Sequence, residues 1–183
     1  MDYLVEWGVE IDVFYFDDFP SAMYFNCPVK KISMKTCIDF EQYDIVHSHC
    51  LRPDIYVAKW KKKLNRAKLV STLHQDTYRT FRYQYNFIMS YILTKYWCFI
   101  QSKFDAIVSI SEQLRRTYRG CIKAPIATIY NGCVINMDGE GDDEIIRSIL
   151  EKKKEYKILG TYAFVTSRKG LDQIIKVLSY LQE

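Results

Sequence analysis

His74 is the residue of this sequence best placed to do chemistry. It follows five strand-like residues and stands beside Gln75 and Asp76. An imidazole in such a position can donate a hydrogen bond to a bound hydroxyl group or accept one from it. The alternative is a histidine at a strand end whose ring is satisfied by backbone groups. The spacing alone leaves both interpretations open.

His47 and His49 stand two residues apart in the extended run at residues 43–49. The alternation of a strand places them on one face. Cys50 follows and suggests a metal site, but no further carboxylate or thiol stands at metal-motif spacing, so we expect no metal. We expect His47 to be buried in packing and His49 to line a cleft. A serine hydrolase is not expected either, because the sequence has no Gly-x-Ser-x-Gly elbow.

A second candidate site lies where a predicted strand meets a predicted helix near the C-terminus. Arg168, Lys169 and Gly170 occupy this junction. Two cations next to the free amides of a helix start favour an anion such as phosphate. The alternative is an ordinary basic loop before a helix.

Four short β-branched runs, separated by helical patterns, must position these residues. They cover residues 43–49, 68–73, 105–111 and 126–132. This order predicts an α/β fold with a Rossmann-like parallel sheet, in which ligands bind beyond the carboxyl ends of the strands. Further strands are predicted at 10–16 and 28–34, and helices at 53–65, 77–103 (with one break) and 111–118, the last with Ser111 as N-cap.

The helical segment at 77–103 is rich in aromatic residues. Its apolar Ile88, Met89, Ile92 and Leu93 complete a face that we expect to be buried in the core. The alternative, a platform on which nucleic acid bases stack, is less favoured.

The composition limits the classes of protein to which this chain can belong. The chain has 183 residues, a net charge of +4, 15 Tyr and 10 Phe. Such a composition argues against disorder, and the modest charge gives no reason to expect nucleic acid as a partner. Six cysteines without a CxxC pair, and an N-terminus without an apolar signal core, predict free thiols in the cytoplasm.

A basic cluster lies within residues 59–68. It is interpreted as the solvated face of a helix or, alternatively, as a surface for peripheral contact with anionic lipid. Its members are Lys59, Lys61, Lys62, Lys63, Arg66 and Lys68.

The character of the chain changes after Gly132. An acidic loop, a charged helix at 144–156, a strand at 157–165 and a helix at 171–181 follow. We therefore predict one domain at 1–135, a linker and helix at 136–156, and the start of a second domain at 157–183. A helix at residues 3–8 with no strand before it suggests that the first domain lacks its first βα unit.

These segments in this order resemble glycosyltransferases of family 4, which have the GT-B fold. The resemblance covers roughly Glu10 to the end, and rests on residues 43–49, Ser71-Thr72-Leu73-His74, residues 105–111, Ile129-Tyr130-Asn131-Gly132 and Lys169-Gly170-Leu171-Asp172. It implies two Rossmann-like domains facing a cleft, one for the acceptor and one for a nucleotide-sugar donor.

The resemblance also implies roles for residues. His74 would be catalytic and contact the donor sugar or acceptor, while Arg168, Lys169 and Gly170 would hold the donor diphosphate. Substrate-binding positions would be His49, Gln75, Asp76, Ser111, Asn131 and Gly132. The co-substrate would be a nucleotide-diphosphate sugar, the acceptor a glycan or lipid-linked glycan, and transfer would retain configuration without metal or other cofactor.

Several family features lie outside this sequence. The first strand and its Gly-rich loop are not seen before Asp2, and the paired-glutamate region would lie beyond Glu183. The chain is therefore expected to be a fragment that is inactive by itself. Two other hypotheses are a non-catalytic protein that docks on membranes or partners, and an oxidoreductase, against which the absent Gly-x-Gly-x-x-Gly counts.

Overall fold

The computed structural model describes residues 2–18, 25–61, 66–132, 142–161, 163, 165–166 and 169–180. The chain divides into two compact units, Met1–Tyr130 and Asn131–Glu183.

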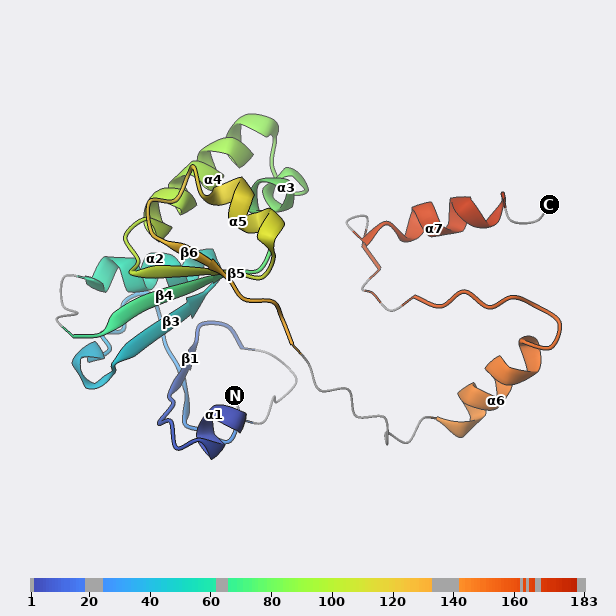
Figure 1. Ribbon diagram of the computed structural model, residues 1–183, viewed down its shortest axis with the longest axis horizontal. Coiled ribbons are helices and arrows are strands. Elements are labelled where there is room, and N and C mark those ends of the chain that lie inside the picture. Colours follow the sequence, from blue (N-terminus) through green and yellow to red (C-terminus); the bar gives the residue numbers. More distant parts are fainter. Residues whose placement is uncertain are drawn as a thin grey trace. The chain divides into compact units, whose positions relative to one another are not determined.

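A four-stranded parallel sheet forms the centre of the first unit (Figure 1). Its strands are β3 (Ile45–His49), β4 (Lys68–Leu73), β5 (Ala106–Ser109) and β6 (Ile126–Thr128), paired in that order. The four apolar runs predicted as strands are thus strands, and the predicted α/β class with a parallel sheet is confirmed.

A second, two-stranded parallel sheet consists of β1 (Val13–Tyr15) and β2 (Val29–Lys31). Both strands lie within the predicted ranges 10–16 and 28–34, but each is shorter than its predicted range. A short helix, α1 (Asp2–Glu6), precedes β1, and a single 3-10 turn, η1 (Phe40–Gln42), precedes β3.

Four helices connect the strands of the larger sheet: α2 (Leu51–Trp60), α3 (Thr77–Arg82), α4 (Phe87–Gln101) and α5 (Glu112–Tyr118). The break predicted in the segment 77–103 lies between α3 and α4. There the Asn86 side chain accepts a hydrogen bond from the Met89 amide at 2.9 Å, which starts α4 as a new helix. The helix predicted at 53–65 begins earlier, at Leu51, and part of its predicted C-terminal end falls outside the described residues.

Helices α2 and α4 cover one face of the larger sheet, and a buried carboxylate joins them to it. Asp54 of α2 has no exposed surface. Its oxygens accept hydrogen bonds from Ser48 at 2.6 Å and Ser71 at 2.8 Å, both on sheet strands, and from Trp97 at 2.6 Å and Gln101 at 3.2 Å, both on α4. Apolar side chains such as Leu69, Leu73 and Ile107 fill the space around this network.

The orientation of α4 differs from the prediction. Ile88, Met89 and Ile92, expected in the core, are exposed. The buried side of α4 instead carries Ser90, Thr94, Trp97, Cys98, Ile100 and Gln101. The prediction was wrong because Asp54 takes its donors Trp97 and Gln101 from α4, and this fixes which side of the helix faces the sheet.

The second unit contains α6 (Asp143–Lys152) and α7 (Leu171–Leu178), close to the two predicted helices. The strand predicted at 157–165 is not formed by the residues described in that range. An isolated strand leaves its backbone groups unpaired, and the described part of this unit contains no other strand with which it could pair.

Candidate functional site

All three histidines of the chain meet at the carboxyl end of β3 and β4. The Nδ1 of His49 lies 2.8 Å from the Nε2 of His74. The ring of His47 stacks on that of His49, with centroids 4.5 Å apart, and its Nε2 lies 2.8 Å from the Thr72 hydroxyl. The predicted shared face of His47 and His49 is confirmed. His47 is exposed rather than buried, because this face of the sheet is the one that α2 and α4 leave uncovered.

The register of the strands explains this arrangement. His49 lies opposite Thr72 in the ladder, and His74 follows two residues later. Ser48 and Ser71 point to the other face, where they bind Asp54. Alternation therefore directs the three imidazoles to the uncovered face.

The environment favours the neutral forms of His47 and His49. Partial burial, together with the neighbouring rings of His47 and His74, lowers the pKa of His49 to about 4. Burial and His74 also lower the pKa of His47. At neutral pH these rings are therefore hydrogen-bonding groups and not cations.

Asp76 has a structural role that the sequence did not reveal. Its carboxylate accepts hydrogen bonds from the Arg79 amide at 3.2 Å, which caps α3, and from the Tyr118 hydroxyl at 2.9 Å. The same hydroxyl lies 2.7 Å from the Thr77 hydroxyl, and burial raises the pKa of Tyr118 to about 12. Asp76 thus connects α3 to α5, and Gln75, half-buried, lies between it and His74.

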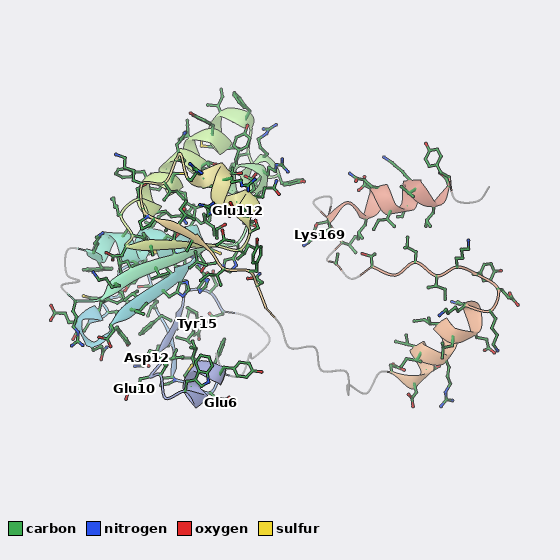
Figure 2. The ribbon with its side chains drawn as sticks, viewed as in Figure 1. Glu6, Glu10, Asp12, Tyr15, Glu112 and Lys169 are labelled. Carbon is green, nitrogen blue, oxygen red and sulfur yellow. The ribbon has the colours of Figure 1, made fainter. Side chains whose placement is uncertain are left out.

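Ser111 is the N-cap of α5, as predicted, and accepts a hydrogen bond from the Leu114 amide at 3.2 Å. The next residue, Glu112 (labelled in Figure 2), was not singled out from the sequence. It pairs with Arg115 at 2.6 Å and Arg116 at 3.1 Å and accepts a hydrogen bond from Thr128 at 3.1 Å. These partners, Arg115 first, lower the pKa of Glu112 to about 2, so this carboxylate stays charged.

The remaining predicted site residues belong to the second unit. Asn131 and Gly132 are exposed at its start. Gly170 adopts the left-handed conformation (φ 67°) as the N-cap of α7, and Lys169 before it is exposed (Figure 2). Arg168 lies outside the described residues. Lys169 and Gly170 are neighbours in the second unit, whereas the three histidines belong to the first unit.

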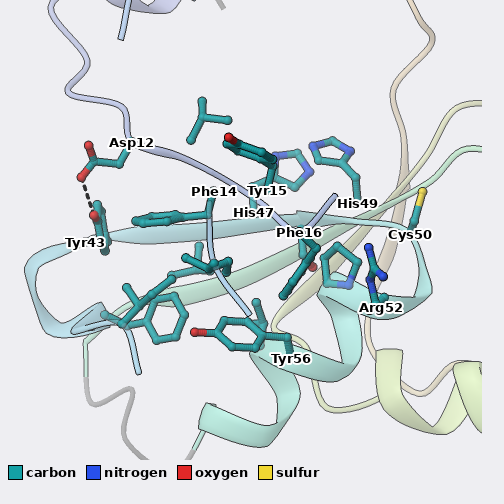
Figure 3. Close-up of a pocket in the computed structure, with 18 of the residues that line it drawn as sticks. Asp12, Phe14, Tyr15, Phe16, Tyr43, His47, His49, Cys50, Arg52 and Tyr56 are labelled. Carbon is teal, nitrogen blue, oxygen red and sulfur yellow. Dashed lines mark hydrogen bonds between the residues drawn. The ribbon is translucent and has the colours of Figure 1, made fainter. Parts of the chain in front are cut away.

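A groove of about 600 Å³ opens beside the histidines, between β1 and the end of β3 (Figure 3). Arg52, at the start of α2, forms an ion pair with Asp17 and lies 5.1 Å from the centre of the Phe16 ring. Neither Arg52 nor Asp17 was predicted as a site residue, because only the fold brings their segments together. A hydrogen bond from Tyr43 to Asp12 joins β1 and β3 at the opposite end.

Two negative findings concern the described part of the chain. Its His, Cys, Asp and Glu side chains form no group of three that could hold a metal ion. Among the helices described, none has the length and apolar character that crossing a membrane requires.

Comparison with known proteins connects this geometry to a family. Residues 2–136 match the model of Glycosyltransferase Family 4. Two proteins from Escherichia coli, both named O-antigen biosynthesis glycosyltransferase WclY, are 27% and 26% identical to this chain over 181 residues. The match covers 93% of this chain and 50% of each relative, so the chain spans about half the length of the curated relatives it matches.

The family match and the structure agree. The matched residues include the whole larger sheet and all three histidines. Parallel sheets flanked by helices are consistent with the Rossmann-like domains of a GT-B fold. The chain belongs to glycosyltransferase family 4.

Proposed function

We propose that the protein of which this chain is part transfers a sugar from a nucleotide-diphosphate sugar to a glycan or lipid-linked acceptor, with retention of configuration. The observation that carries the proposal is the His49–His74 pair at the carboxyl end of the parallel sheet, where α/β folds bind ligands. The two relatives named as O-antigen biosynthesis glycosyltransferases support sugar transfer as the reaction class.

In this proposal His74 contacts a sugar hydroxyl. Because His49 Nδ1 and His74 Nε2 share one hydrogen bond, the tautomer of His49 determines whether His74 Nε2 donates or accepts. When His74 Nε2 donates, its Nδ1 accepts, and when Nε2 accepts, Nδ1 donates. We propose that this Nδ1 forms the hydrogen bond with the substrate hydroxyl. His49 acts as a positioning residue, and its low pKa keeps it neutral for this task.

The proposed donor site lies in the second unit. Arg168 and Lys169 supply positive charge for the diphosphate, and Gly170 allows the chain to turn closely into α7. Stabilisation of the leaving nucleoside diphosphate by these cations needs no metal. Asn131 and Gly132 mark the approach to this unit, and Gln75 and Ser111 remain proposed substrate contacts.

The test is sugar transfer by a version of the chain extended at both ends with the flanking regions of a full-length relative. Release of nucleoside diphosphate is measured with common UDP-, GDP- and dTDP-sugars and a lipid-linked glycan acceptor. We expect turnover that His74→Ala lowers about 100-fold, a typical size for loss of a positioned acid–base or hydrogen-bonding group. Tyr3→Phe, at an exposed position of α1 outside the proposed site, is the control. Absence of both transfer and donor hydrolysis with every donor contradicts the proposal.

A second candidate function is docking on an anionic membrane surface, and the outward face of α4 favours it. This face exposes Phe87, Ile88, Met89, Tyr91, Ile92, Tyr96 and Phe99. A contiguous apolar patch of this kind on a helix is typical of an interaction site. The helix has no acidic residue, and Lys95 and Lys103 lie over the rings of Tyr91 and Phe99 at 5.5 and 4.6 Å.

One described member of the basic cluster, Lys61, meets the C-terminal end of α4. Lys61 donates a hydrogen bond to the Lys103 carbonyl, which brings the end of α2 to this helix. We therefore propose that the described cations Lys59 and Lys61 act with the apolar face of α4, and not alone. Apolar burial would supply the attraction and the lysines a preference for anionic lipid.

Liposome co-sedimentation tests this docking. We expect the chain to sediment with vesicles containing phosphatidylglycerol and much less with phosphatidylcholine alone. Ile88→Gln combined with Ile92→Gln should abolish binding, and Lys59→Gln with Lys61→Gln should weaken it. The matched control is Ile129→Gln, on an exposed residue outside α4. Equal sedimentation of the α4 variant and the control variant would show that α4 does not bind the membrane.

A further inference from the structure

Two cysteine thiols of the first unit lie together near the C-terminal end of α4. Cys98, on the buried side of this helix, is 3% exposed, whereas Cys121, in the segment that follows α5, is partly exposed. Cys121 packs against the core cluster to which Cys98 belongs. Burial, and then a hydrogen bond with Cys121, raise the pKa of the Cys98 thiol. The two free thiols are thus neighbours in the folded chain.

Lys95 brings a positive charge to this pair of thiols. It precedes Cys98 by three residues on α4, and residues at this spacing are neighbours on the helix surface. The Nζ of Lys95 lies 3.7 Å from the Cys121 sulfur. The charge of Cys121 is the first cause that raises the pKa of Lys95, so the lysine stays protonated beside the sulfur. An ammonium group next to a thiol favours the thiolate, which is the reactive form of cysteine.

The fold holds Cys121 in this place by hydrogen bonds on both sides. Its amide donates to the Tyr118 carbonyl at 2.8 Å, and the Lys123 amide donates to the Ser102 hydroxyl at 2.9 Å. Ser102 in turn donates to the Cys98 carbonyl at 2.7 Å. The segment that carries Cys121 is therefore tied both to α5 and to the end of α4 that carries Cys98.

We propose that Cys121 is a site of oxidation by hydrogen peroxide, and that Cys98 converts the oxidised cysteine into a disulfide. The Cys121 thiolate attacks one peroxide oxygen, the O–O bond breaks, and Cys121 becomes a sulfenic acid. The hydroxide that leaves takes up the proton of the original thiol and becomes water. The Cys98 sulfur then attacks the sulfenic sulfur, the S–O bond breaks, and the hydroxyl group leaves with the Cys98 proton as a second water. The two thiols together lose two electrons, which reduce the peroxide.

The two cysteines suit these different steps. Cys121 is accessible to a small oxidant and has the lysine that favours its thiolate. Cys98 is shielded from solvent and its raised pKa keeps it protonated, so we expect it to react only with a sulfenic acid formed beside it. Cysteines that sense oxidants commonly combine an accessible thiolate with such a second thiol.

The disulfide would join α4 covalently to the segment after α5. Helix α5 begins beyond its N-cap, Ser111, which is a proposed substrate contact. Oxidation would therefore restrict the movement of an element that reaches the proposed site. Any effect on sugar transfer rests on the proposed function, whereas the oxidation itself does not.

Peptide mapping of the chain after treatment with hydrogen peroxide tests this assignment. Free thiols are blocked with iodoacetamide, the chain is digested, and mass spectrometry identifies the state of each cysteine. We expect a linked pair of peptides that contains Cys98 and Cys121, lacks two hydrogen atoms and separates when dithiothreitol is added. In urea the yield of this pair should fall at least about tenfold, because the unfolded chain must close a loop to bring the thiols together.

Variants separate the roles of the three residues. Cys98→Ala should leave Cys121 as a sulfenic acid that dimedone labels, and Cys121→Ala should leave Cys98 unoxidised. In the Cys98→Ala chain, Lys95→Met should slow the labelling of Cys121 about threefold, the size expected for one exposed charge pair. The matched control is Lys59→Met, at an exposed lysine of α2, which should leave the rate unchanged.

Three results in the unsubstituted chain would overturn the proposal, and none depends on the folding of a variant. The first is oxidation of the exposed Cys37 or Cys50 before Cys121. The second is an equal yield of the linked pair with and without urea, which would show that the fold does not create the site. The third is a sulfenic acid that persists at Cys121 without a disulfide, which would exclude Cys98 from the reaction. Because no readout uses sugar transfer, failure here is distinct from failure of the proposed function.

Discussion

His49 Nδ1 lies 2.8 Å from His74 Nε2, so the two rings share one hydrogen bond in which only one of them can donate. This contact ties the end of β3 to the residue that follows β4. His47, stacked on His49 and bonded to Thr72, supports the pair from the side. Partial burial and the neighbouring rings of His47 and His74 lower the pKa of His49, so the neutral form of His49 is favoured in this arrangement.

The first prediction concerns the stability of this cluster at low pH. The pKa of His49 is about 4 in the folded chain and ordinarily about 6.5, so the unfolded chain binds more protons between these values. The contribution of His49 to stability is therefore complete above about pH 6.5 and is lost as the pH falls toward 4. Urea unfolding between pH 4.5 and 7.5 should show this slope, and His49→Gln should flatten it. An identical slope in the variant would contradict the prediction.

The second prediction concerns the buried carboxylate of Asp54. Asp54→Ala leaves four buried donors without their acceptor, those of Ser48, Ser71, Trp97 and Gln101. Each unsatisfied buried group costs about 1–3 kcal/mol, so we expect the free energy of unfolding to fall by at least about 3 kcal/mol.

Asp54→Asn separates lost hydrogen bonds from lost charge. The amide keeps one acceptor for Trp97 and Gln101, and the serine hydroxyls can reverse to accept from its NH₂ group. We therefore expect Asp54→Asn to destabilise less than Asp54→Ala in chemical denaturation. Asp44→Ala, which removes an exposed ion pair with Arg66, is the control and should cost less than about 1 kcal/mol. Equal losses for the two Asp54 variants would contradict the proposed role of the network.

The strands of the larger sheet can be predicted from the sequence, whereas the Asp54 network cannot. The four apolar runs predicted the strands of the larger sheet, because short β-branched runs between helical patterns carry a local signal. No such local signal in the sequence indicates which side of α4 faces the sheet. Its apolar residues outnumber its polar ones on the outward side, yet Trp97 and Gln101 turn inward to a carboxylate more than 40 residues earlier in the chain.

The groove and the histidine cluster show the same division. Alternation predicted that His47 and His49 share a face, because that depends only on neighbours in the sequence. The contact between His49 and His74 depends on the register of β3 and β4, and the groove depends on how β1 meets β3. Such pairings are properties of the tertiary structure and leave no spacing pattern.

The third prediction concerns the hydroxyl of Tyr118. It donates to Asp76, lies 2.7 Å from the Thr77 hydroxyl and accepts from the Tyr78 amide at 3.2 Å. Tyr118→Phe should therefore lower the free energy of unfolding by about 1–3 kcal/mol, because buried partners lose a bond. Tyr130→Phe, at an exposed tyrosine, should change stability little. Equal effects of the two changes in thermal unfolding would contradict the assigned contacts.

The last prediction separates the two roles of Ser111, which caps α5 and is also a proposed substrate contact. Ser111→Ala removes the acceptor for the Leu114 amide and should cost about 1 kcal/mol of stability. Ser111→Asn keeps a cap of similar strength and should restore that loss. If the hydroxyl also binds substrate, both variants of the extended chain will raise the KM for the acceptor or donor, although only Ser111→Ala is less stable. If Ser111→Asn matches the unsubstituted chain in both KM and stability, Ser111 acts as a helix cap alone. At a substrate contact, replacing the hydroxyl by an amide would change the length of the side chain and its donor geometry, and the KM would change with them.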